Sequence, residues 1–124
     1  MKKESKEWMY QSGSELGSAK DLLKTKRYSQ SAFHSHQAAE FAIKALLIEK
    51  KGLILGHDLS YLARELGAPN DILDKCDLLN PPYMDARYVD RAGIAPSKLY
   101  DYDRAIKSLN TARKIVKWVR DHIG

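Results

Sequence analysis

The sequence predicts an all-α fold, an antiparallel bundle of four to five helices that forms a single domain over residues 1–124. Apolar residues recur at three- and four-residue spacing in several segments, which is the period of an amphipathic helix. No segment shows the period-two alternation of a half-buried strand. Glycines and prolines separate the helical segments, and a chain of 124 residues is long enough to bury a core without disulfides.

The first helix is expected from Ser5 to Thr25, and the short link Lys26–Arg27 favours an antiparallel hairpin with the next helix. The segment from Tyr28 to Lys51 contains no Gly or Pro and ends at Gly52, so it predicts the longest helix. A helical wheel gives it one broad apolar face, made of Ala32, Phe33, His36, Ala39, Ile43, Leu46 and Leu47.

A second, smaller apolar stripe on the same helix consists of Ala38, Phe41, Ala45 and Ile48. Because two sides of this helix are apolar, we expect it to be the central helix, with its second stripe covered by another helix or by a partner chain. Gln37, Glu40 and Lys44 run between the stripes at spacings of three and four, which aligns their side chains.

The remaining helices follow from start and stop residues. Asp58 is expected to cap a short helix that Gly67 closes, and a fourth helix is expected to begin at Asn70 and to end at Pro81 and Pro82. Residues around Gly93 and Pro96 are expected to form a loop. The last helix is predicted from Asp101 to His122, with a core face of Tyr102, Ala105, Ile106, Leu109, Ala112, Val116 and Val119.

Two further features of the last helix point outward. Lys107, Lys114 and Lys117 are expected to form a solvated face, with RNA contact as the alternative. Ile115 and Trp118 lie off the core stripe and are expected to contact a partner. With Phe41 and Ile48 of the central helix, they make up the predicted dimer or partner interface.

Composition excludes several classes of protein. No apolar run approaches the 18 residues of a membrane span, and the charged start of the chain does not resemble a signal peptide. The lone Cys76 cannot form an internal disulfide, which fits a cytoplasmic protein. His34 and His36 point in different directions on a helix, so no metal or cofactor is expected. A net charge of +5 is compatible with an anionic partner such as nucleotide or RNA.

Several short motifs resemble the HEPN family (higher eukaryote and prokaryote nucleotide-binding domains) over nearly the whole chain. The motifs are Trp8, Tyr28, Gln37-Ala-Ala-Glu40 with Lys44-Ala-Leu, His57-Asp58-Leu59, and Ala86-Arg87-Tyr88 with Asp90. The resemblance implies a helical bundle that is usually a homodimer. It also implies a partner protein, because members are often encoded beside a minimal nucleotidyltransferase. Members form complexes or toxin–antitoxin pairs with that enzyme. Several branches of the family are ribonucleases.

The ribonuclease branches carry an Arg and a His with four to six residues between them. Arg87 is the fitting Arg in this chain, but Ala92, Gly93 and Ile94 occupy the positions where the His is needed. Arg27 and His34 have a suitable spacing but lie at the start of the central helix. The sequence therefore favours a protein without the catalytic motif.

The hypothesis is a non-catalytic module that holds nucleotide or RNA in a polar groove formed by Gln37, Glu40, Lys44, His57, Arg87 and Tyr88. Each residue also has a structural interpretation. Arg87 fits a salt bridge, Tyr88 fits packing between helix ends, and Gln37, Glu40 and Lys44 fit a register-fixing ion pair with a buried amide. His57 with Asp58 fits a helix cap rather than a proton-handling pair. The alternative functions are an unconventional metal-independent ribonuclease toxin and a protein assembly adaptor without a small ligand.

Overall fold

The protein is a bundle of helices in which one long helix is surrounded by the others. The computed structural model describes residues 1–52, 56–85, 88–89 and 93–124, and it describes residues 81–85 by their backbone alone. The long helices are α1 (Lys3–Lys24), α2 (Tyr28–Lys50), α4 (Asn70–Asp85) and α7 (Tyr102–Ile123), and the short ones are α3 (Leu59–Glu65) and α6 (Pro96–Leu99). The described residues contain no strand, and the predicted all-α bundle is confirmed.

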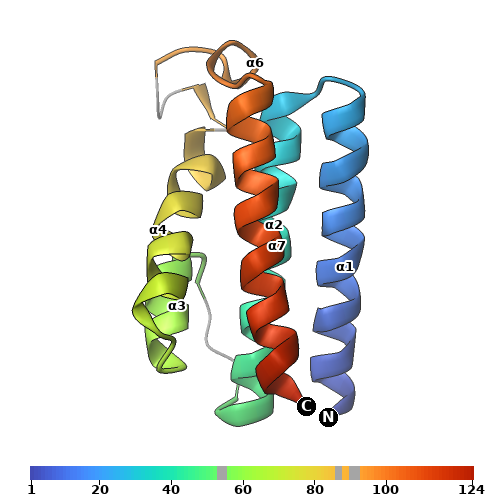
Figure 1. The fold of residues 1–124 in the computed structure, drawn as a ribbon, viewed down its shortest axis with the longest axis vertical. Helices are drawn as coiled ribbons and strands as arrows, with labels where there is room; N and C mark the ends of the chain where they lie inside the picture. The colour runs from blue at the N-terminus through green and yellow to red at the C-terminus, as the bar shows by residue number, and fades with distance from the viewer. Residues whose placement is uncertain (53–55, 86–87, 90–92) are drawn as a thin grey trace.

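The long helices run side by side along the length of the molecule (Figure 1). α1 runs antiparallel to α2, and α4 runs antiparallel to α7, while α3 lies beside α4. α2 contacts α1, α3, α4, α6 and α7, so its central position is confirmed. The two ends of the chain lie together at one end of the bundle.

Small residues bring α1 and α2 close together. The Ser12 hydroxyl of α1 donates to the Ala38 carbonyl of α2 at 2.7 Å, and the Ser31 hydroxyl of α2 donates to the Ala19 carbonyl of α1 at 2.7 Å. Both serines are buried, so these hydrogen bonds satisfy hydroxyls that have lost water. Since each side chain reaches the backbone of the opposite helix, the two helices approach each other closely at these serines.

The second apolar stripe of α2 is covered within the same chain. Trp8 of α1 packs against Phe41, with ring centroids 5.3 Å apart, and Ala38, Ala45 and Ile48 are buried. Four residues of the broad stripe enter the main core with residues of α3, α4 and α7, namely Ala39, Ile43, Leu46 and Leu47, while Ala32 and Phe33 pack in a second cluster with Tyr100. A partner chain is therefore not needed to cover either stripe.

Two predictions about helix ends are wrong. α4 does not end at Pro81 and Pro82 but continues to Asp85, and residues 96–99, within the expected loop, form the single turn of α6. A proline ring fixes φ near the helical value, so a helix can pass it at the cost of an amide donor. Packing of α4 against α2, α3 and α7 offsets such a cost.

The prediction that Ile115 lies off the core is also wrong. Its side chain is fully buried in the main core, and Ile48 is 4% exposed. α7 contacts α1, α2 and α4, so its apolar face is wider than a single stripe facing one neighbour. Trp118 is half-buried and packs against the edge of the same core. Contact of Phe41 or Trp118 with another chain stays a prediction.

Replacing Ile115 by Ala tests its place in the core. The change leaves a cavity, and we expect the free energy of unfolding to fall by about 2–5 kcal/mol. Ile94→Ala removes the same atoms from a side chain that is 42% exposed and serves as the matched control. Urea unfolding measures the stability of both variants. Equal, small losses of unfolding free energy would contradict the burial of Ile115 in the core.

Candidate polar site around Glu40

The carboxylate of Glu40 lies buried at the middle of α2. Its side chain is 1% exposed, and its Oε2 accepts a hydrogen bond from Lys44 Nζ at 2.7 Å. His57 Nδ1 lies 3.0 Å from both carboxylate oxygens. His36 Nδ1 lies 3.8 Å from Oε1. A buried carboxylate is tolerated only when charge and hydrogen bonds compensate for lost hydration, and these neighbours supply both.

Three parts of the fold bring these groups together. His36, Glu40 and Lys44 are spaced four residues apart on α2, so they lie on one line along the helix. His57 comes from the segment before α3. Trp8 comes from α1, and Lys44 Nζ lies 5.7 Å from its ring centroid, within the range of a cation–π contact. The Lys44 charge is therefore met by a carboxylate and by an aromatic face.

The two histidines beside Glu40 differ in exposure. His36 is fully buried, and desolvation lowers its pKa from 6.5 to about 4, although the Glu40 carboxylate opposes this shift. His36 is therefore neutral at pH 7. The His57 side chain is 54% exposed and so reaches solvent while Glu40 orients its ring. A histidine in this arrangement can donate to an anion or move a proton.

Asp58 has the role of a helix cap. Its side chain accepts hydrogen bonds from the Ser60 and Tyr61 amides at 3.1 and 3.2 Å, which confirms the predicted N-cap of α3. The carboxylate that lies against His57 Nδ1 is that of Glu40. The Ser60 hydroxyl also donates to Asp77 and thereby joins α3 to α4.

The predicted groove residues are brought together only in part. Glu40, Lys44 and His57 form one network, and Gln37 is half-buried on the same helix. Tyr88 is 38% exposed. Arg87 lies outside the described residues, so its position relative to Glu40 stays a prediction.

The sequence reasoning missed His36 and Trp8 as members of this network. The helical wheel places His36 on the apolar face, although its spacing of four residues from Glu40 also predicts contact with that carboxylate. His34 instead pairs with Glu15 of α1. Within the described part of the chain, no group of three or more His, Cys, Asp or Glu side chains is placed to hold a metal ion. No helix there is long and apolar enough to cross a bilayer.

Comparisons with known proteins agree in fold and family. The HEPN domain model matches residues 5–122. TT1696 from Thermus thermophilus is 26% identical with a TM-score of 0.90, over 97% of this chain and 98% of that one. ST0689, an archaeal HEPN homologue, is 31% identical with a TM-score of 0.87, over 99% and 100%.

A HEPN domain protein from Thermotoga maritima, TM0613, shares the fold alone. It is 24% identical with a TM-score of 0.75, over 93% of this chain and 95% of that one. Comparison with curated protein sequences gives no match.

A double-mutant cycle tests the dependence of Lys44 on Glu40. Glu40→Gln keeps the shape but leaves the Lys44 ammonium without its carboxylate, and we expect a loss of about 3–5 kcal/mol in the free energy of unfolding. Lys44→Met in the Glu40→Gln background removes the unpaired charge and should recover much of this loss. Denaturant unfolding of the single and double variants measures the coupling, and additive losses would show that the pair is not coupled.

His36 should make stability depend on pH. Its pKa is lower in the folded protein than in the unfolded chain, so the unfolded chain binds more protons between about pH 6.5 and pH 4. The free energy of unfolding should therefore fall with acidification across this window, by up to about 1.4 kcal/mol per pH unit. Urea midpoints across the window measure it.

The comparison is made between variants, because the side chains of Glu40 and His57 face His36. His36→Gln should flatten the pH slope, whereas His122→Gln, which removes an exposed histidine, should leave it unchanged. Identical slopes in all three proteins would mean that the burial of His36 has no such effect.

Proposed function

This chain belongs to the HEPN domain family, and we propose that it is a non-catalytic binding module that holds nucleotide or RNA. In this proposal it works in the cytoplasm as a homodimer and associates with a minimal nucleotidyltransferase, as one half of a toxin–antitoxin-like pair. The ligand occupies the polar site around Glu40.

The observation that carries the proposal is the half-exposed imidazole of His57 held by the buried carboxylate of Glu40. Both Glu40 oxygens lie 3.0 Å from Nδ1, so the ring is fixed in orientation while more than half of the side chain is exposed. Lys44 balances the Glu40 charge, which reduces repulsion of an incoming phosphate. Arg87 and Tyr88 would add a phosphate-binding fork and a surface for base stacking.

Two features favour binding over catalysis. The spacing of Arg and His found in the ribonuclease branches is absent after Arg87. The Glu40 carboxylate is already engaged by Lys44 and His57. In this proposal it orients the His57 ring and neutralises the Lys44 charge, and it does not accept a proton from a substrate.

The Glu40–His57 pair also favours the second candidate function, an unconventional ribonuclease toxin. A histidine oriented by a carboxylate is a suitable general base for a ribose hydroxyl, and no metal is required for that step. This function predicts cleavage of RNA in the presence of a chelator, and cleavage that is lost in His57→Gln.

A third candidate is a protein assembly adaptor. Trp118 lines a pocket of about 270 Å³ together with Leu46, Leu66, Lys50, Lys51 and His122. This mixture of apolar and basic lining residues suits an apolar side chain flanked by acidic residues on a partner such as the nucleotidyltransferase.

Calorimetric titration of the purified protein with ATP, GTP and a short RNA tests the first function. We expect micromolar binding of one ligand, and a loss of at least about tenfold in affinity in His57→Gln and in Arg87→Ala, because the first loses the imidazole that Glu40 orients and the second loses the guanidinium donors to phosphate. His122→Gln is the matched control for the first variant, since that histidine is exposed and lies outside the site.

The recovered RNA separates the candidate functions. Intact RNA with His57-dependent binding supports the binding module, whereas RNA cut by the wild-type protein and left whole by His57→Gln supports the ribonuclease. If no ligand produces heat and the RNA stays intact, the adaptor becomes the working function.

A further inference from the structure

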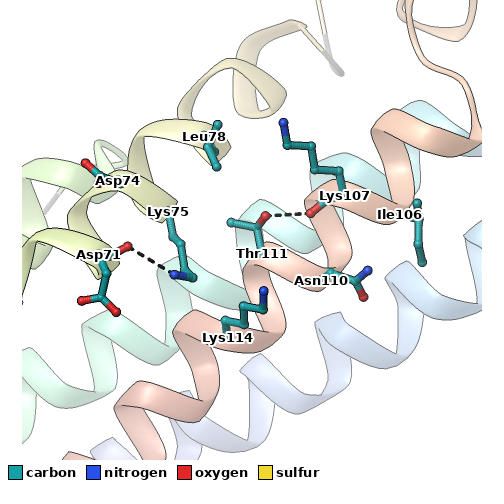
Figure 2. Close-up of a pocket in the computed structure, with 9 residues that line it drawn as sticks. All are labelled: Asp71, Asp74, Lys75, Leu78, Ile106, Lys107, Asn110, Thr111 and Lys114. Atoms are coloured by element: carbon teal, nitrogen blue, oxygen red, sulfur yellow. Dashed lines mark hydrogen bonds between the residues drawn. The ribbon is translucent and has the colours of Figure 1, made fainter.

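A second polar site lies between α4 and α7. Here the two helices border a groove with a cavity volume of about 600 Å³. Figure 2 shows Lys75 extending from α4 toward α7, with Thr111 and Lys114 on the facing helix. The groove shares no lining residue with the Glu40 site, so the inference drawn from it does not depend on the proposed function.

Three lysines give the groove its cationic character, namely Lys75 of α4 and Lys107 and Lys114 of α7. Lys107 and Lys114 are exposed and form no ion pair among the described residues. By contrast, Lys117 on the same helix is paired with Asp121 at 3.0 Å. Lys75 Nζ reaches the Asp71 carbonyl at 3.5 Å, which is a long hydrogen bond. These ammonium groups are therefore available to an external anion.

The lysines of α7 are spread along the groove rather than gathered at one point. Lys107 and Lys114 are seven residues apart in the helix, so their Cα atoms lie about 10.5 Å apart along its axis. One phosphate cannot be contacted closely by both lysines over that span. A chain of phosphates can be, and between these lysines Asn110 offers an amide donor.

The lining chemistry further restricts the ligand. None of the described residues that line the groove is aromatic, so these residues offer no stacking surface for bases. The lysine ammonium group is a compact point charge that binds phosphate and does not distinguish the edges of bases. Asp71 and Asp74 line the α4 side and repel anions, so a polyanion is favoured along the α7 wall.

We propose that this groove binds the phosphodiester backbone of single-stranded nucleic acid, without regard to base sequence. Lys107 and Lys114 contact successive parts of the strand, and Lys75 closes it from the opposite wall. Asp71 and Asp74 weaken the attraction and keep the strand against α7.

Fluorescence anisotropy with a labelled oligouridylate about a dozen nucleotides long, at salt concentrations from about 50 to 200 mM, tests this. In Lys107→Gln/Lys114→Gln we expect affinity to fall at least about tenfold at low salt. The slope of log affinity against log salt should become shallower by about 1.4, or about 0.7 for each phosphate that a lysine no longer neutralises. Asp71→Asn/Asp74→Asn should bind more tightly than the wild-type protein.

Controls separate the groove from general charge and from the Glu40 site. Lys20→Gln/Lys24→Gln removes the same charge from exposed positions of α1 and should change the affinity less than twofold. Equal losses in the groove and α1 variants would overturn the proposal. Loss of oligouridylate binding in His57→Gln, with binding retained in Lys107→Gln/Lys114→Gln, would assign the RNA to the Glu40 site instead and overturn the proposal.

Competition identifies the chemistry of the ligand. Unlabelled oligothymidylate of the same length should displace the probe, because the groove contacts the backbone. If inorganic phosphate at the same phosphate concentration competes equally well, the groove is a site for single anions and the proposal is wrong. If polyglutamate of equal charge competes equally well, the preferred ligand is an acidic polypeptide, which also overturns it.

Discussion

The burial of one carboxylate, that of Glu40, constrains three separate parts of the chain. A charge at 1% exposure is stable only with compensation, and here that compensation comes from Lys44 on α2 and from His57 before α3. Lys44 is itself buried and lies over the ring of Trp8 on α1. The helix hairpin, the central helix and the entry to α3 are thus joined at one point, so disturbing any one of these groups disturbs the others.

This arrangement depends on how closely α1 and α2 pack. Ser12 and Ser31 each reach a carbonyl of the opposite helix, which requires the two backbones to be near each other. Close approach places Trp8 where it can contact both Phe41 and Lys44. Larger side chains at the serine positions would separate the helices and remove the aromatic cover from the Lys44 ammonium. The small residues therefore support the polar site as well as the fold.

The sequence predicted those features that depend on local chemistry. The limits of α2 and the Asp58 cap follow from a Gly-free stretch and a capping side chain, and both are found. The passage of α4 beyond Pro81 and the burial of Ile115 were missed because packing by neighbouring helices decides them. The Glu40–Lys44 pair follows from its i, i+4 spacing, whereas the approach of His57 to Glu40 depends on the path of the chain after α2 and is expected only from the resemblance to the HEPN family.

Salt screens the electrostatic interactions of the lysines in the two polar sites to different extents. Lys44 is 8% exposed, and its carboxylate partner at 2.7 Å is shielded from solvent, so screening by salt affects this pair little. Lys107 and Lys114 are exposed, and their attraction for a distant anion falls once the Debye length drops below about 10 Å. Raising the salt concentration should therefore release a ligand from the α4–α7 groove while the bundle and the Glu40 network remain intact. A binding site with this property can be loaded and emptied without unfolding any part of the protein.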